Sequence, residues 1–110
     1  MGTHMHQGFG LVVRFSLSSE DAAAAFDELC ERTMEGIKAH EPGTLAYVRH
    51  VPVDEPLTRV FYELYADRDA FEAHEAQQHT RRFLAEREQY LVGVEVTFLE
   101  AAGGKLTAQL

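Results

Sequence analysis

The stretch that decides the fold runs from Tyr62 to Phe83 and reads YELYADRDAFEAHEAQQHTRRF. The first four residues of this stretch are the end of a run from Thr58 to Tyr65, whose alternating pattern predicts a strand. Asp67 is a good N-cap for the helical region that follows, which we expect to continue to about Tyr90. The apolar spacing fails between Glu75 and His79, so we expect a break in the helix there.

The flanking sequence supplies the other elements of a small sheet and a second helix. Three further segments are rich in β-branched and aromatic residues and are predicted strands: residues 10–17, 44–53 and 92–99. Ser18 and Ser19 offer N-caps for a segment with helical apolar spacing that ends near His40. The order β-α-β-β-α-β predicts an α+β, ferredoxin-like fold with a four-stranded antiparallel sheet and both helices on one face.

Length and composition predict a single domain in a reducing compartment. The chain has 110 residues, a net charge of −8 and one cysteine, Cys30. The charge argues against nucleic acid and anionic membrane surfaces as partners, and a single thiol forms no internal disulfide. No apolar run reaches the length of a membrane span, so we expect a cytoplasmic protein. We expect a cloning scar at residues 1–4, the domain at residues 9–100 and a C-terminal tail at residues 101–110.

Both faces of the predicted sheet carry apolar side chains. Val12, Val48 and Phe61 are assigned to one face, and Leu11, Tyr47 and Tyr62 to the other. Two helices on one side cover only one face, and a sheet with one solvated face should alternate apolar with polar residues. We therefore predict a homodimer packed sheet to sheet, which closes a barrel and covers the second face.

The element order and two motifs resemble the antibiotic biosynthesis monooxygenase domain family. The motifs are the turn EPGTLAYVRH at residues 41–50 and the run FYELYADRDAFEAHEAQQHTRRF at residues 61–83. The positions that carry the resemblance are Glu63, Tyr65, Asp67, Ala70, Phe71, His74 and Phe83. The resemblance implies a dimeric α+β barrel with a ligand pocket against the second helix. The family includes cofactor-free quinone-forming monooxygenases, haem-degrading enzymes and an isomerase.

Two departures from the family's branches bear on the activity. The chain has no tryptophan, whereas some monooxygenases of this family place one in the pocket. Arg14 and Tyr65 stand where the resemblance to the haem-degrading branch would require an asparagine and a tryptophan. The resemblance therefore implies oxidation without haem, flavin or metal, and no cofactor is expected.

We expect the pocket between the helices and the sheet to hold a small aromatic ligand. Its expected substrate-binding residues are Phe61, Glu63, Tyr65, Phe71, His79 and Phe83. His74 is the expected catalytic base, since an imidazole titrates near neutral pH, and Arg14 is expected to stabilise the substrate anion. The reaction would convert a phenol or hydroquinone to a quinone with O₂. The alternative is a non-catalytic dimeric module that binds a small ligand, and an isomerase acting on a polar metabolite ranks third.

Each of these residues also has a structural interpretation. The structural alternative for His74 is a buried residue that bonds a backbone carbonyl or Glu63, and for His79 it is a solvated residue at a helix end. Arg14 could form an ion pair with Glu63 or Glu95. The five-residue spacing of the two histidines does not suit two ligands of one metal on a helix, so no metal site is predicted. Two basic groups near the end of the second helix, Arg81-Arg82 and Arg87, predict a solvated face.

Overall fold

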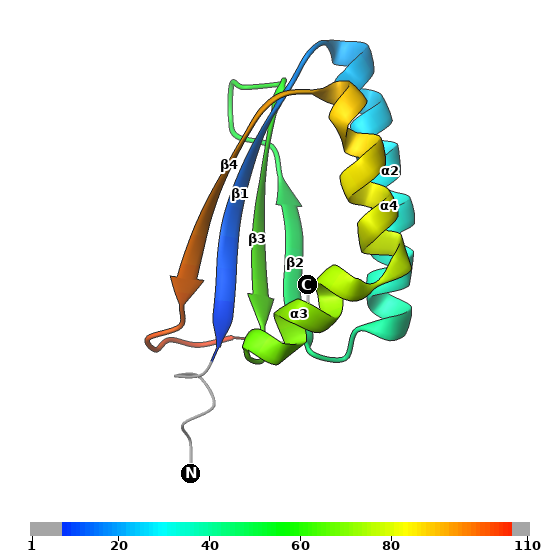
Figure 1. The fold of residues 1–110 in the computed structure, drawn as a ribbon. Coiled ribbons are helices and arrows are strands. Elements are labelled where there is room, and N and C mark those ends of the chain that lie inside the picture. The colour runs from blue at the N-terminus through cyan, green and yellow to red at the C-terminus, as the bar shows by residue number, and fades with distance from the viewer. Residues whose placement is uncertain (1–7, 107–110) are drawn as a thin grey trace.

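The computed structural model describes residues 8–106 and arranges them as a sheet with a helical layer (Figure 1). The elements are β1 (Phe9–Leu17), α2 (Glu20–His40), β2 (Thr44–His50), β3 (Thr58–Tyr65), α3 (Arg68–Ala76), α4 (Gln78–Glu86), the 3-10 helix η1 (Arg87–Tyr90) and β4 (Leu91–Glu100). The predicted cloning scar at residues 1–4 and the last part of the predicted tail, residues 107–110, lie outside the described residues.

The sheet has four strands in the order β2-β3-β1-β4, and every neighbouring pair is antiparallel. Figure 1 shows α2 and α4 side by side on one face of this sheet, with α3 crossing below them. The predicted α+β, ferredoxin-like arrangement is confirmed. Because β1 and β3 are the two central strands, their helix-facing side chains line the sheet side of any cavity between the sheet and the helices.

The helix ends follow from side-chain caps. Ser19, rather than Ser18, is the N-cap of α2, and its hydroxyl accepts a hydrogen bond from the backbone N–H of Ala22 at 3.0 Å. Asp67 caps α3 as predicted, since its carboxylate accepts from the backbone N–H of Ala70 at 2.8 Å. The predicted break is confirmed at Gln77, whose extended backbone separates α3 from α4.

The second strand is shorter than predicted. β2 ends at His50, whereas the sequence pattern favoured a strand to Val53. Pro52 has no N–H to donate to a ladder. Asp54 has a φ of 67°, the left-handed conformation of a turn residue. The chain therefore leaves the sheet at residue 51 and returns with β3.

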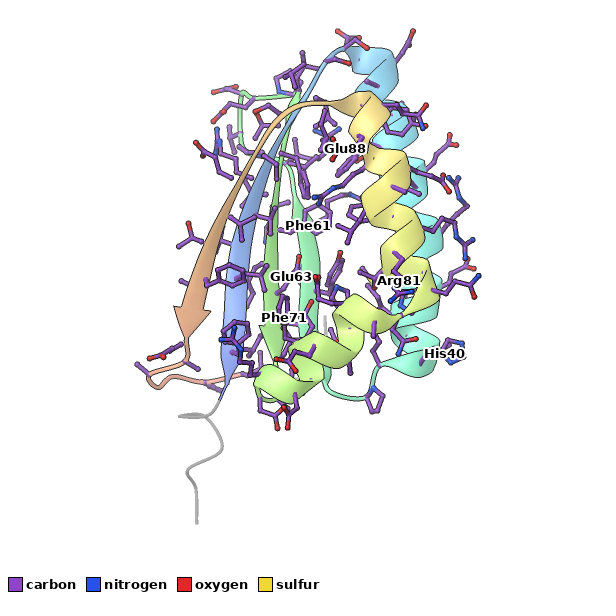
Figure 2. All side chains as sticks on the ribbon, in the orientation of Figure 1. His40, Phe61, Glu63, Phe71, Arg81 and Glu88 are labelled. Atoms are coloured by element: carbon purple, nitrogen blue, oxygen red, sulfur yellow. The ribbon has the colours of Figure 1, made fainter. Side chains whose placement is uncertain are left out.

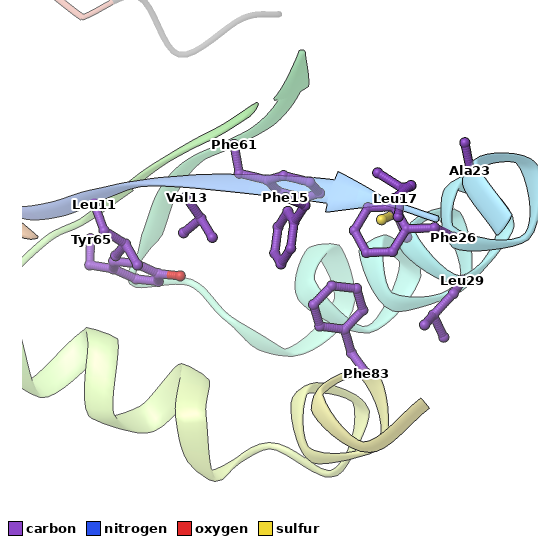
Figure 3. Packing of buried hydrophobic residues seen from close by; sticks show 11 residues of the cluster. Leu11, Val13, Phe15, Leu17, Ala23, Phe26, Leu29, Phe61, Tyr65 and Phe83 are labelled. Carbon is purple, nitrogen blue, oxygen red and sulfur yellow. The ribbon is translucent and has the colours of Figure 1, made fainter. Parts of the chain in front are cut away.

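Aromatic rings pack together with aliphatic side chains in the core between the two layers (Figure 3). Phe15 of β1 and Phe61 of β3 meet Phe26 of α2 and Phe83 of α4, with ring centroids 5.0 to 6.4 Å apart. Tilted and edge-to-face rings at such distances gain energy beyond the area they bury. These contacts hold α2 and α4 against the sheet, and two of the rings, Phe15 and Phe83, also line a cavity between the layers.

The opposite, outer face of the sheet has an apolar centre that is incompletely covered, and it also carries Arg14 and Glu95. Its half-buried apolar side chains are Val12, Val48, Val60, Tyr62 and Leu99. The face assignment of two residues was wrong: Tyr62 shares the face of Val12, with which it pairs, and Phe61 pairs with Val13 on the helix side. Residues 101–106 of the predicted tail border this face, since they line a hollow together with Tyr62 and Leu64. On the helix side, the edge strand β4 extends past the helical layer and leaves Val96 and Phe98 47% and 59% exposed. None of the helices in residues 8–106 is long and apolar enough to cross a membrane.

Candidate functional site

A cavity of about 190 Å³ lies between the sheet and the segment that contains α3, α4 and η1. Its lining residues are Leu11, Val13, Phe15, Tyr47, Glu63, Phe71, His74, Glu75, Thr80, Phe83, Leu84, Arg87, Val96 and Phe98. Figure 2 shows Glu63 and Phe71 at this place, between the sheet and the helices. Apolar and aromatic walls with a few polar groups are typical of small-molecule sites.

His74 is the polar group most firmly fixed in the cavity wall. It belongs to the last turn of α3, its side chain is 4% exposed, and its ring packs against the rings of Tyr47 and Tyr65 at 5.6 and 5.2 Å. Its Nδ1 lies 2.7 Å from Oε1 of Glu41. An ionised carboxylate has no proton to donate, so the imidazole N–H is the donor. The second ring nitrogen, Nε2, has no hydrogen-bond partner among residues 8–106 and is free for a ligand.

Glu41 is a buried carboxylate with three donors around it. It is the C-cap residue of α2, and its side chain is 3% exposed. Thr44 donates to Oε1 at 2.7 Å, and Nε2 of His79 donates to Oε2. Burial acts to raise the pKa of Glu41, but the hydrogen bonds from His74, Thr44 and His79 outweigh it and lower the pKa to about 2. Glu41 therefore carries a constant negative charge throughout the neutral range.

Glu63 and Tyr65 form a second buried polar pair on β3. The Tyr65 hydroxyl donates to Oε1 of Glu63 at 2.6 Å. Burial is the main cause that raises the pKa of Glu63, although the Tyr65 hydrogen bond and the charge of His74 oppose it. Burial and the negative charge of Glu63 also raise the pKa of the Tyr65 hydroxyl, which stays protonated. Only Glu63 reaches the cavity, where its carboxylate can accept a hydrogen bond from a ligand hydroxyl.

Arg87 supplies a positive charge on the other side of the cavity. Its guanidinium lies over the rings of Phe15 and Phe83, 5.4 and 5.7 Å from their centroids. The side chain is 19% exposed, and its nearest carboxylate contact is Glu88 at 3.8 Å. Its buried Nε has no hydrogen-bond partner within the described chain. A buried N–H without a partner is costly, and because this Nε has almost no accessible surface, a ligand in the cavity would meet the charge of the guanidinium and not this N–H.

The structure brings together half of the residues expected at the site. Glu63, Phe71, His74 and Phe83 line the cavity. Phe61 and Tyr65 lie on the correct face of β3, but they are 1% and 0% exposed and belong to the core beneath it.

The other two expected residues, His79 and Arg14, are elsewhere. His79 lies behind Glu41 and lines a polar surface cleft between α2 and α4. Arg14 projects from the outer face of β1 and pairs with Glu55, not with Glu63 or Glu95. It therefore lies across the sheet from the cavity, because residues 11, 13 and 15 of the same strand point to the helices.

Two polar residues of the site were not expected from the sequence. Glu41 was interpreted only as part of a helix-ending turn, and nothing local links it to a histidine 33 positions further along the chain. Arg87 was interpreted as part of a solvated face, yet a signal for it exists. The cavity residues Thr80, Phe83, Leu84 and Arg87 follow the spacing i, i+3, i+4, i+7 of one helix face.

The arrangement of Glu41, His74 and His79 is a hydrogen-bond bridge. The two imidazoles form hydrogen bonds with different oxygens of the carboxylate, and their nitrogens do not converge on a common metal position. Among residues 8–106, no group of three or more His, Cys, Asp and Glu side chains is arranged to hold a metal ion.

Comparison with known proteins identifies the family. The family model for the antibiotic biosynthesis monooxygenases matches residues 8–86, so the chain belongs to this family. A search of curated protein sequences finds no significant match.

Solved structures of the same fold come from bacteria and an archaeon. A Caulobacter crescentus protein assigned to this family superposes with a TM-score of 0.82 at 24% identity, covering 91% of this chain and 94% of its own. A conserved protein from Methanosarcina mazei gives a TM-score of 0.82 at 14% identity, covering 93% of this chain and 100% of its own. A variant of SnoaB, a cofactor-independent oxygenase from Streptomyces nogalater, gives 0.77 at 21% identity, with 89% and 96% covered. At these identities the likeness shows the fold alone.

Proposed function

We propose that the chain is a cofactor-independent monooxygenase that oxidises a small phenol or hydroquinone to a quinone with O₂. The observation that carries the proposal is the environment of His74. One ring nitrogen is bonded to a permanently ionised carboxylate, and the other is free in an aromatic cavity. A carboxylate on one nitrogen stabilises the imidazolium that forms when the other nitrogen takes a proton. Membership of a monooxygenase family, which includes a structural neighbour described as a cofactor-independent oxygenase, supports the same reaction.

The first step of the proposed reaction is proton transfer from the substrate. The phenolic O–H bond breaks, an N–H bond forms at Nε2 of His74, and the electron pair stays on the oxygen. The resulting phenolate is electron-rich enough to give one electron to O₂, and the two radicals combine to form a C–O bond at a ring carbon that bears hydrogen. This carbon is para to the oxygen in a phenol and ortho to it in a hydroquinone. The peroxide takes the proton back from His74. Loss of the proton from that carbon with cleavage of the O–O bond then yields water and a quinone, which carries a hydroxyl group when the substrate is a hydroquinone.

Arg87 takes the anion-stabilising role that the sequence assigned to Arg14. Arg87 lines the cavity with its guanidinium over the rings of Phe15 and Phe83, whereas Arg14 lies across the sheet. A cation held in place before the reaction stabilises a developing phenolate without reorganising. Glu63 would accept a hydrogen bond from a second hydroxyl, and Phe71 and Phe83 would flank the ring. A cavity of about 190 Å³ favours a substrate with one or two rings.

We further propose that the protein is a cytoplasmic homodimer whose two subunits pack through the outer faces of their sheets. The incompletely covered side chains of that face, with Val12, Val48 and Tyr62 at its centre, support this assembly. The cavity lies on the opposite, helical side, so such a dimer carries two separate sites.

The test is oxygen uptake and quinone absorbance with the purified protein, without flavin or metal, against hydroquinones, naphthols and anthrones. His74→Ala should lower kcat by about 10² to 10⁴-fold, and Arg87→Gln by about 10²-fold. The matched controls are His40→Ala and Arg82→Gln, which change the same residue types outside the cavity and should keep full turnover. Full turnover in His74→Ala would remove the assigned base. Binding of an aromatic ligand without oxygen uptake would identify a binding module instead.

A further inference from the structure

The bridge between His74, Glu41 and His79 connects the cavity to the surface of the molecule. His74 faces the cavity, and His79 lines a polar cleft whose other residues include Gly36 and His40 of α2 and Arg82 of α4. Glu41, buried between the two rings, offers one oxygen to each. The bridge thus ties the C-terminal end of α2 to the last turn of α3 and the first turn of α4.

We propose that Glu41 is a positioning residue that holds the proton of His74 on Nδ1, and that His79 fixes the carboxylate from its other side. The inference rests on the proposed function of His74 as the base. A neutral imidazole has two tautomers, and only the one with its proton on Nδ1 leaves a lone pair on Nε2 for the substrate. The 2.7 Å contact to an acceptor-only oxygen selects that tautomer.

The second oxygen of Glu41 explains why a histidine stands at position 79. Without a donor there, a glutamate side chain can rotate and present either oxygen to His74. His79 and Thr44 remove that freedom, since they engage Oε2 and Oε1 respectively. The pKa of about 2 keeps the carboxylate an acceptor at every pH at which an imidazole base works.

The packing of His79 is equally specific. A Cβ placed on Gly36 would come within 2.4 Å of its Nδ1 and 2.5 Å of its Cγ. The imidazole therefore lies directly against the backbone of α2, and a side chain at position 36 would clash with it. His40 stacks on the same ring at a centroid distance of 6.4 Å but makes no hydrogen bond to Glu41. The charged and titratable groups around the bridge are Tyr47, Glu63, Tyr65, Glu75 and Arg87 on the cavity side, and Arg32, Glu35, His40 and Arg82 on the cleft side.

The test records ring ¹⁵N and N–H proton signals of ¹⁵N-histidine-labelled full-length protein at neutral pH. The wild type should show His74 with a protonated Nδ1 and an unprotonated Nε2, and a downfield Nδ1 proton typical of a charge-assisted bond. In Glu41→Gln this proton should move upfield or vanish, because a neutral carboxamide is a weaker acceptor than a carboxylate and has one acceptor oxygen instead of two. Turnover should fall by about 10²-fold in kcat with KM unchanged.

Substitutions at position 79 separate positioning from general loss of structure. His79→Gln keeps an N–H donor and should retain the His74 signals, whereas His79→Ala should weaken them. His40→Gln is the matched control, since it alters the neighbouring ring without touching the carboxylate, and it should leave all His74 signals unchanged.

The two proposals fail in different ways. Unchanged His74 signals and unchanged kcat in a folded Glu41→Gln protein would overturn the positioning role even if His74→Ala is inactive. Altered His74 signals in that variant, with no turnover of any phenol by the wild type, would support the positioning role and count against the monooxygenase.

Discussion

At the scale of single residues, the lowered pKa of Glu41 makes the stability of the fold depend on pH in a way that can be measured. Its pKa is lowered from 4.5 to about 2, because the three hydrogen bonds outweigh the effect of burial. A group whose pKa is depressed in the folded state contributes stability above its unfolded pKa and loses it as the pH falls through the folded value. For Glu41 that window lies between about pH 4.5 and pH 2. The contribution at neutral pH is about 3 kcal/mol.

We predict that Glu41→Gln reduces the amount by which the free energy of unfolding falls between pH 6 and pH 2.5. Urea unfolding at pH 6, 4 and 2.5 should show a lower free energy of unfolding for Glu41→Gln at pH 6 and a smaller loss on acidification. Glu31→Gln is the control, since its carboxylate lies in an exposed ion pair with Arg49 and should track the wild type closely. Parallel pH curves for Glu41→Gln and the wild type would contradict the prediction.

At the scale of the secondary-structure elements, Gly36, about one turn before the end of α2, is costly for the helix itself. Glycine in a helix interior is about 1 kcal/mol less favourable than alanine. The gain from Gly36→Ala is opposed by the clash with His79, whose Cβ, Cγ and Nδ1 all lie within 3.0 Å of the added Cβ. Because the Cβ of His79 cannot move without α4, this clash falls in the range of core overpacking, about 1 to 3 kcal/mol.

We predict that Gly36→Ala lowers the free energy of unfolding by up to about 2 kcal/mol, because overpacking exceeds the gain in helix propensity. In the background of His79→Ala, the same substitution should be close to neutral, because the contacts with Nδ1 and Cγ are gone while the Cβ of residue 79 still lies 3.0 Å from the added Cβ. Urea unfolding of the four proteins of this double-mutant cycle measures the coupling. Additive effects would show that the ring of His79 does not rest on Gly36 in solution.

The elements also show what local sequence patterns can and cannot predict. Alternation predicted β3 from Thr58 to Tyr65 without error, and the failed spacing after Glu75 predicted the break between α3 and α4. The site depends on which strand faces meet, and that depends on register. Leu11 pairs with Glu63, and Val13 with Phe61, which places Arg14 on the opposite side from both. Strand periodicity already separates Arg14 from Leu11, but only the pairing shows that Glu63 shares the face of Leu11.

Long-range packing accounts for the residues that the patterns missed. Glu41 meets His74 because α3 folds back beneath the end of α2, a contact between segments that no spacing rule connects. Arg87 follows the helix face of Phe83, but its charge favoured solvent in the sequence interpretation. The stem of an arginine can lie along aromatic rings with its head directed into a cavity, and residue type alone does not distinguish this from a solvated position.

At the scale of the whole molecule, the outer face of the sheet is the surface that we propose for the dimer. Val12, Val48, Val60, Tyr62 and Leu99 form a continuous set across four antiparallel strands, because register places them on one side. Residues 101–106 border only one end of this surface. A second copy would bury it against an identical face, which is the self-complementary arrangement of a two-fold dimer.

We predict that Tyr62→Glu converts a homodimer into a monomer, because a charge at the centre of an apolar interface loses its hydration without gaining a partner. Sedimentation velocity or light scattering at micromolar concentration measures the mass of wild type and variant. Val53→Glu is the control, since Val53 is 87% exposed in the turn before β3 and should leave the dimer intact. A monomeric wild type, or a dimeric Tyr62→Glu protein, would rule out this face as the interface. The helix-side cavity is remote from Tyr62, so the monomeric variant should still bind an aromatic ligand there if each site is built from one chain.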